Sequence, residues 1–257
     1  MCWMYADDAE FRAAAVEFLV DGRRLDQGLL YIGDGPEEKL RADLDSLDDL
    51  DSLIDGGTLR VLSLQELQAL EGPIDAEAQL TAYVAATDLA VEAGHTGLRV
   101  VSEVTAMVTA SESWPAHTRW ESLADRSISS RPVTALCCYD RRRLPDSLLS
   151  DLAAVHPASR APARMAPFRF FSREPDTLAL EGEVDYFSAD DLVRLLEMAP
   201  DAGGEVSLDL GGLGFVDHHG VMALIRYARS IRAKGVLSFK NVPHPVARLC
   251  ELMGVAL

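Results

Sequence analysis

The stretch that decides the fold runs from Val206 to Val221 and reads VSLDLGGLGFVDHHGV. Its first part, 206–210, is a short apolar run and predicts a buried strand. After a glycine-rich loop, apolar residues recur at helical spacing, which predicts a helix from about 218 to 233. A buried strand followed at once by an amphipathic helix is typical of an α/β protein.

The segments on both sides of this stretch complete a compact module. Residues 168–171 and 177–181 predict paired strands around a turn. The sequence Ser-Ala-Asp-Asp at 188–191 is a helix N-cap signature, because short polar side chains accept hydrogen bonds from the first helical N–H groups. A strand at 237–239 and a closing helix at 245–253 finish the module, which we place at 168–257.

A change in composition separates this module from the first part of the chain. Residues 158–167 are rich in alanine and proline and predict a linker. Residues 1–157, which we assign to a first domain, alternate strand and helix patterns, so a mostly parallel sheet with helices on its faces is expected. The predicted strands are 2–5, 29–32, 59–62, 98–103 and 133–139, and the predicted helices begin near residues 7, 37, 76 and 118.

The charge of the chain excludes several classes of protein. The formal net charge is −17, and most of the acidic excess lies in the first 72 residues. Nucleic acids and anionic membrane surfaces both require a basic face, so neither is an expected partner. No apolar run approaches the length of a membrane span, and the four cysteines lack CxxC spacing. We expect a protein of the reducing cytoplasm.

The carboxyl ends of the predicted strands are where open parallel sheets bind ligands. The first strand is followed by Tyr5-Ala6-Asp7-Asp8, without the glycines and lysine that cradle a phosphate. Ordinary nucleotide hydrolysis is therefore not expected. Glu103 and Asp140 lie at the ends of two other strands. The arginines at 141–143 are expected to pair with acidic groups at these ends, and anion binding is the alternative.

Four motifs of residues 1–157 resemble one known family. They are Cys2-x-x-Tyr5, Gly28-Leu-Leu-Tyr-Ile32, Gly97-Leu-Arg-Val100 and the run from Arg131 to Arg143. Together they resemble a MEDS domain, the methanogen/methylotroph sensory domain of dichloromethane-repressor type. The resemblance implies a RecA/KaiC-like, mostly parallel sheet without a phosphate loop. It also implies sensing of a small, apolar molecule without catalysis and without a cofactor.

The candidate sensor residues are aromatic, acidic and cysteine side chains, and the alternative for several of them is simple core packing. Members of the family usually carry a histidine two positions before the cysteine that matches Cys2, a position that the sequence does not include. The candidates are Cys2, Tyr5, Glu103, Trp120, Glu121, Cys137 and Asp140.

Two motifs of the second module resemble another family. They are Gly182-Glu-Val-Asp185 and the run from Asp209 to Val221, which contains an Asp-x-x-Gly loop. These motifs are similar to a STAS domain, the sulphate transporter and anti-sigma factor antagonist module. Without a membrane span the antagonist branch fits, which implies docking to an anti-sigma factor of the histidine-kinase-like ATPase type. The implied docking residues are Asp217, His218, His219, Gly220, Val221 and Leu224.

His218 occupies the position at which the antagonist branch carries its phosphorylated serine. With no hydroxyl there, serine phosphorylation is excluded, and docking is constitutive or governed by the first domain. A histidine pKa near 6.5 leaves pH-dependent docking as an alternative, although an imidazolium at a helix N-terminus opposes the helix dipole. A phosphohistidine and a metal held by His218, His219 and His244 are further alternatives, but no known ligand spacing is complete, so no metal is expected.

The sequence thus favours a cytoplasmic signalling regulator that is not an enzyme, in which a small-molecule sensor controls a docking module. Two alternatives belong to other classes. Glu103 and Asp140 are also compatible with a divalent-cation-binding or nucleotide-binding enzyme. A STAS-type module that mediates only self-association would instead make the protein a homo-oligomeric scaffold.

Overall fold

A computed structural model shows two compact units, one of Met1–His117 with Arg131–Leu149, the other of Thr118–Ser130 with Ser150–Leu257. Residues 118–130 and 150–157 therefore group with the C-terminal module, and the predicted linker at 158–167 stays a prediction. The structure describes residues 1–67, 75–109, 114–162, 165, 167–174, 176–198, 205–232 and 236–254.

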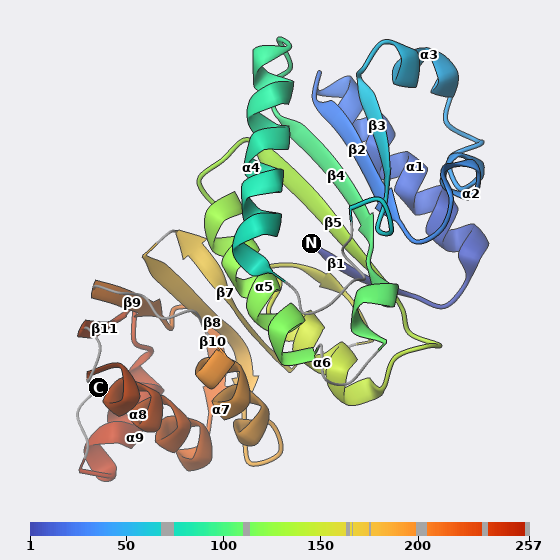
Figure 1. Ribbon diagram of the computed structural model, residues 1–257. Helices are drawn as coiled ribbons and strands as arrows, with labels where there is room; N and C mark the ends of the chain where they lie inside the picture. The colour runs from blue at the N-terminus through green and yellow to red at the C-terminus, as the bar shows by residue number, and fades with distance from the viewer. Residues whose placement is uncertain are drawn as a thin grey trace. The chain divides into compact units, whose positions relative to one another are not determined.

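The first unit is built on a parallel sheet, as the alternating pattern predicted (Figure 1). Every pair of neighbouring strands in the order β3-β2-β4-β5-β1 runs parallel. All residues of β2 and β4 are buried, because helices cover both faces of the sheet. The strands are β1 (Cys2–Tyr5), β2 (Gly28–Gly33), β3 (Leu59–Ser63), β4 (Leu98–Glu103) and β5 (Val133–Asp140).

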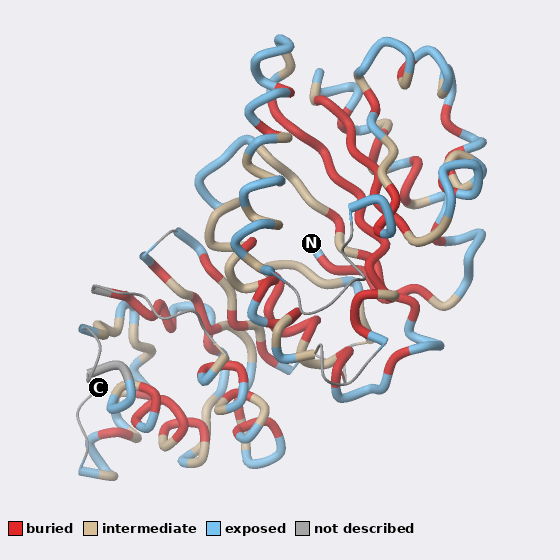
Figure 2. The backbone as a smooth tube through the Cα atoms, viewed as in Figure 1, coloured by how far each residue is buried: buried red, intermediate tan, exposed pale blue. Residues whose placement is uncertain are grey.

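Two long helices cover opposite faces of this sheet. Leu19 of α1 (Asp8–Arg24) packs in one core cluster with Val101 of β4. On the next residue of β4, Ser102 Oγ lies 2.9 Å from the Tyr83 hydroxyl of α4 (Ala76–Glu92). Since successive side chains of a strand point to opposite faces, α1 and α4 lie on opposite sides of β4. Figure 2 shows the buried strands between them.

Several shorter elements depart from the predicted ones. The helix predicted to begin near residue 118 begins four residues earlier, and two short helices and a 3-10 turn were not predicted. The shorter of the two helices and the 3-10 turn are too short for a helical period to show. In the other missed helix, apolar residues do recur at helical spacing and are buried, namely Leu148, Leu149, Leu152 and Ala153. The remaining helices before residue 158 are α2 (Glu37–Ala42), α3 (Leu50–Asp55), η1 (Thr105–Val108), α5 (Trp114–Ile128) and α6 (Asp146–Ala154).

The second unit contains a mixed sheet around β8 (Thr177–Val184). β7 (Phe168–Glu174) pairs antiparallel with β8, confirming the predicted strand pair. β9 (Glu205–Asp209) and β10 (Leu213–Val216) both pair with β8 in parallel, at different positions along it. β11 (Val236–Lys240) lies beyond β9. β10 was not among the predicted strands.

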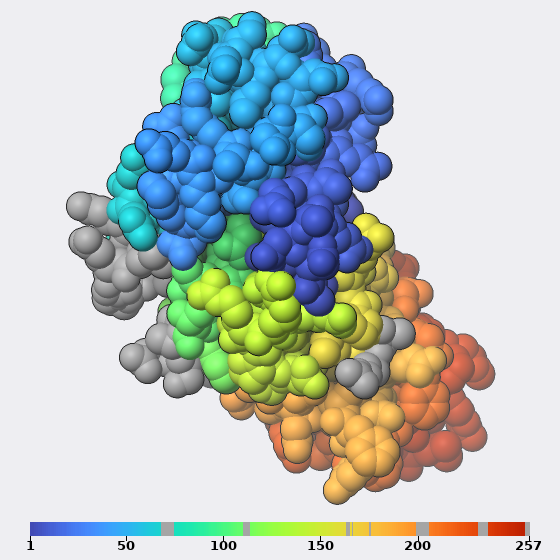
Figure 3. All heavy atoms as spheres, turned by 90° about the vertical axis from the view of Figure 1, so that its right-hand side faces the viewer, coloured from blue at the N-terminus to red at the C-terminus, as the bar shows by residue number. Residues whose placement is uncertain are grey.

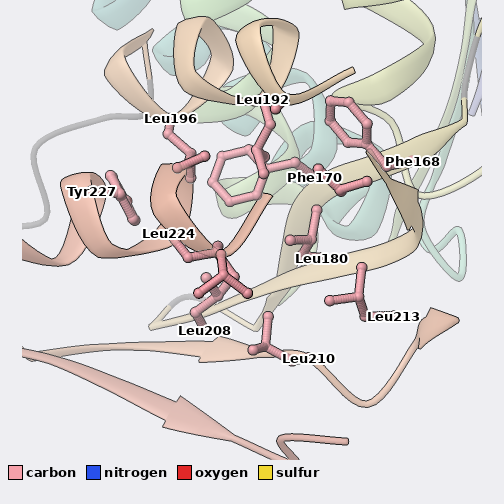
Figure 4. Close-up of a cluster of buried hydrophobic side chains, with 14 of the residues drawn as sticks. Phe168, Phe170, Leu180, Leu192, Leu196, Leu208, Leu210, Leu213, Leu224 and Tyr227 are labelled. Atoms are coloured by element: carbon pink, nitrogen blue, oxygen red, sulfur yellow. The ribbon is translucent and has the colours of Figure 1, made fainter. Parts of the chain in front are cut away.

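The helices of the second unit pack on this sheet through one hydrophobic core (Figure 4). Leu192 and Leu196 of α7 (Ala189–Met198) and Leu224 of α8 (His218–Arg232) meet Phe170 and Leu180 of the strands. Burying a side chain of this size stabilises the fold by roughly 1.5–3 kcal/mol each. The other elements are β6 (Ser159–Arg160), within the predicted linker, and α9 (His244–Leu252).

Candidate functional site

Three predicted sensor residues meet at one edge of the parallel sheet. Tyr5 ends β1 and lies opposite Asp140, the last residue of β5, and Glu103 ends β4. All three line a cavity of about 220 Å³ at the carboxyl ends of the strands, which we call the strand-end cavity. Figure 3 shows this region, where the start of the chain (dark blue) lies beside the segment after β5 (yellow-green). The geometry is the usual ligand-binding position of an open α/β sheet.

Glu103 is held by donors from two other segments. Its Oε1 accepts hydrogen bonds from the Tyr5 hydroxyl, at 3.2 Å, and from the Thr105 backbone N–H, at 3.3 Å. The Thr105 hydroxyl also donates to the same oxygen and accepts from the Asp140 backbone N–H, at 2.8 Å. Thr105 thereby connects the ends of β4 and β5. The sequence offered one signal for it, a hydroxyl two residues after a strand-end acid.

Burial sets the ionisation of this group. Glu103 is only 9% exposed, and burial raises its pKa above the ordinary value, while the Thr105 and Tyr5 donors oppose the rise. Burial, together with the charges of Glu103 and Asp140, also raises the pKa of Tyr5, so its hydroxyl remains a donor. Within the described part of the chain, no hydrogen bond reaches Glu103 Oε2.

Asp140 is fully engaged by its neighbour. Arg142 binds it through Nε and Nη2, at 2.8 and 2.7 Å, and also donates to Asp8 at the start of α1. The hydrogen bonds from Arg142 hold the pKa of Asp140 below its ordinary value. This confirms, for Arg142, the expected pairing with acidic strand-end residues.

The N-terminus of α1 is occupied by the protein's own carboxylate. Asp7 Oδ1 accepts a hydrogen bond from the Glu10 backbone N–H at 2.9 Å, which caps the helix. A nucleotide phosphate would need these N–H groups for itself. Asp7 therefore uses the helix N-terminus at which a phosphate would bind, and the lack of nucleotide chemistry stays a prediction.

The other four predicted sensor residues lie elsewhere. Cys2 and Cys137 are register partners on β1 and β5, at the end of β1 away from Tyr5. Trp120 and Glu121 are buried on α5, in the part of that helix that belongs to the second unit. None of the four lines the strand-end cavity.

The predicted docking loop begins with a helix cap. Asp217 Oδ1 accepts hydrogen bonds from the backbone N–H groups of His219, at 2.8 Å, and Gly220, at 3.1 Å. Burial opposes ionisation of Asp217, but these donors outweigh it and hold its pKa below the ordinary value. Its Oδ2 lies 3.4 Å from His219 Nδ1.

Glycine is required at position 220 by close packing. A Cβ there would lie 2.5 Å from Val216 Cγ2 and 2.9 Å from Val184 Cγ1. The start of α8 therefore rests directly on β10 and β8. Val221 and Leu224 are fully buried in the core, so the structure places them as anchors of α8 and not on a docking surface.

An exposed aromatic cluster that the sequence analysis missed lies beside this loop. Tyr186 and Phe187, which follow β8, are 63% and 85% exposed. The Tyr186 ring packs edge-on against His219, 4.9 Å between centroids, and the His219 ring lies 3.9 Å from that of His218. The available signal was two adjacent aromatics in a polar turn before a helix cap. We call Tyr186, Phe187, His218 and His219 the docking face.

The same loop gathers potential metal ligands. Side-chain ligand atoms of Asp217, His218 and His219 lie within 4.8 Å of one another. His244, which the sequence had suggested as a third histidine, is not in this group. The positive end of the α8 dipole disfavours a cation at this loop, which supports the expectation that it binds no metal. That expectation stays a prediction.

Comparison with known families accounts for both halves of the chain. Residues 1–157 match the sequence model described as MEDS, methanogen/methylotroph, DcmR sensory domain. The chain belongs to the MEDS family. Residues 170–256 match the model described as Mlab, STAS domain, so both resemblances are confirmed. Comparison with curated proteins gives no significant match. In the described residues of this MEDS–STAS chain, no helix is long and apolar enough to cross a membrane.

Replacing Glu103 by Gln is expected to stabilise the protein increasingly as pH rises. The buried carboxyl has a raised pKa, so the stability it provides is lost as pH rises from about its ordinary value of 4.5 through the raised one. The amide of the variant keeps the Oε1 acceptor without the charge. Thermal unfolding should show a Tm gain of about 2–4 °C at pH 8 that shrinks towards pH 4. The exposed control Glu92→Gln should show no such trend, and a pH-independent Glu103→Gln effect would contradict the argument.

Gly220→Ala should destabilise the second unit by about 1–3 kcal/mol, because the two valines against it have stiff, β-branched side chains. Chemical denaturation measures the loss. Gly214→Ala is the matched control, since its Cβ would meet only Gly182 O at an ordinary 3.6 Å. Equal stabilities of the two variants would show that α8 does not need this close approach.

Proposed function

We propose that the MEDS part of the chain binds a small molecule and thereby governs docking of the STAS part to an anti-sigma factor of the histidine-kinase-like ATPase type. The MEDS and STAS families are regulatory or sensory, and the chain has a signalling or regulatory role. The observation that supports docking to an anti-sigma factor is the docking face. It is an exposed aromatic surface at the loop where the antagonist branch contacts its partner.

The physical case for docking is the cost of leaving this surface in water. Large aromatic side chains are seldom as exposed as Phe187 and Tyr186 unless another surface covers them. Aromatic residues are also enriched at the centres of protein interfaces. Asp217 fixes the adjacent backbone, so the docking face is held in shape before a partner arrives.

The case for sensing without nucleotide chemistry comes from the strand-end cavity. It has the position of a ligand site, but Asp7 caps the helix that a phosphate would use, and Asp8 adds a second carboxylate beside it. A bound ligand there contacts the ends of β1, β4 and β5 together. These features support binding of a signal molecule over turnover of a nucleotide.

Contacts inside the second unit between the MEDS and STAS matches support control of docking by the MEDS part. Asp151 of α6, within the MEDS match, forms an ion pair with Arg194 of α7, within the STAS match, at 2.6 Å. Asp125 of α5 likewise accepts a hydrogen bond from the Ser172 backbone N–H at 2.6 Å, and burial raises its pKa to about 6. Because α7 packs on α8, a shift of α6 reaches the helix that begins at the docking face.

Docking should survive ATP. Full-length protein bound to an anti-sigma factor of this ATPase type should remain bound when ATP is added, because His218 offers no hydroxyl to phosphorylate. His218→Ser restores the hydroxyl, and ATP should then release the partner. A pull-down with and without ATP measures both. ATP-dependent release of the unaltered protein would overturn docking that does not depend on phosphorylation.

Truncating the aromatic docking residues should weaken this binding. Tyr186→Ala and Phe187→Ala are each expected to lower affinity about tenfold or more, the usual loss at a buried interface aromatic. Leu252→Ala is the control, because Leu252 is a similarly exposed apolar residue of the same unit. If light scattering instead shows a dimer that Phe187→Ala dissociates, with no anti-sigma factor bound, the face serves self-association.

The Asp151–Arg194 pair should couple α6 to α7 energetically. Arg194→Met leaves a carboxylate that is 13% exposed without its partner and should cost about 1–3 kcal/mol. Adding Asp151→Asn should recover part of that loss in a double-mutant cycle measured by denaturation. The exposed Arg248–Glu251 pair is the control and should contribute close to nothing. A coupling energy near zero for Asp151–Arg194 would remove this route.

A further inference from the structure

The lining of the strand-end cavity is charged and hydroxylic, in contrast to the small apolar ligand that the MEDS resemblance implied. Its volume of about 220 Å³ suits a molecule of roughly ten non-hydrogen atoms. Apolar ligands gain affinity by removing apolar surface from water, and this cavity offers little of it. The charges of the lining therefore decide what it binds.

Most of these charges are already compensated within the protein. Arg142 forms ion pairs with both Asp140 and Asp8, so each carboxylate has a partner although one negative charge of the trio remains. Asp43 accepts a hydrogen bond from the Tyr31 hydroxyl at 3.3 Å and lies 3.8 Å from Arg12. These groups shape the wall of the cavity but need no partner from outside.

Glu103 is the main acceptor left open. It is nine-tenths buried and lines the cavity, while its three hydrogen bonds all go to Oε1. A buried carboxylate oxygen without a donor is costly, so a ligand donor at Oε2 gains more there than it would in water. The Asp34 carboxylate, on another part of the lining, adds negative charge.

Two cationic side chains of the lining, Lys39 and Arg143, can bind a negative group of a ligand. Lys39 Nζ donates to the Asp34 carbonyl oxygen at 2.6 Å, which leaves its charge without a carboxylate partner among the described residues. Arg143 also lines the cavity; its charge helps to lower the pKa values of Glu103 and Asp140, but no ion pair of its side chain occurs in the described part of the chain. A ligand for this cavity must therefore bring both a positive group and a negative group.

We propose that the strand-end cavity binds a small zwitterion of the free α-amino-acid class, with its ammonium group at Glu103 and its carboxylate at Lys39 and Arg143. This proposal rests on the proposed function in one respect, that the bound zwitterion is the signal that governs docking. A divalent cation fits less well, because Asp140, the second carboxylate that the sequence offered for it, is bound on both oxygens by Arg142. An anion alone leaves Glu103 unmatched.

The test is binding of the twenty free amino acids to the full chain, by thermal shift and then calorimetry. At about 10 mM, at least one should raise the Tm. Removing its amine or its carboxylate, as in the matched carboxylic acid and amine, should each weaken binding at least tenfold. Glu103→Gln and Lys39→Met should cause similar losses, and Arg60→Met, at the other end of the sheet, should cause none.

Each remaining outcome has a definite meaning. No shift with any amino acid, equal binding of the acid or amine alone, or tighter binding of an apolar probe such as dichloromethane would overturn the zwitterion. If Glu103→Gln does not fold, Lys39→Met carries the test, because Lys39 is exposed. Amino-acid binding that leaves anti-sigma docking unchanged would overturn the proposed function but not the ligand class. Ligand-dependent docking without binding of any amino acid would overturn the ligand class but not the proposed function.

Discussion

The parallel pairing of β4, β5 and β1 is the constraint on which the first unit depends. It brings the ends of three strands, from opposite ends of a domain-length segment, to one edge of the sheet. Backbone groups stop pairing there, so side chains complete the structure. Thr105 and Arg142 do so by connecting Glu103, Asp140 and Asp8. The cavity is what remains between these connections, which is why its lining is charged.

The acidity of the N-terminal part has a local role within this arrangement. Asp7 caps α1 and Asp8 receives Arg142, so two of the acidic residues stabilise the edge where a nucleotide-binding sheet would hold phosphate. A carboxylate at a helix N-terminus satisfies the same N–H groups and the same dipole as a phosphate does. The first unit thus keeps the strand-end geometry at which α/β sheets bind ligands, but the carboxylate of Asp7 takes the place of a phosphate at the helix N-terminus.

The second unit repeats this logic at the start of α8. Asp217 caps the helix, and Gly220 lets it approach β8 and β10 closely enough for Val221 to enter the core. Val221 and Leu224 are thus buried in the core, whereas Tyr186, Phe187 and Phe215 remain exposed near the two histidines. Ion pairing of Asp151 with Arg194 connects α6, within the MEDS match, to α7 of the STAS match.

The sequence by itself determined the fold class, both families, the strands of the parallel sheet and the Asp-x-x-Gly loop, because hydrophobic periodicity and short motifs are local properties. It also indicated Tyr5, Glu103 and Asp140, since carboxyl ends of parallel strands share an edge. Only the tertiary structure decided that Cys2 and Cys137 lie away from that edge and that Leu224 is core. It also showed that Thr105 connects two strand ends and that Phe187 is exposed. Those outcomes depend on strand register and on which face of an element is covered, and residues distant in the chain set both.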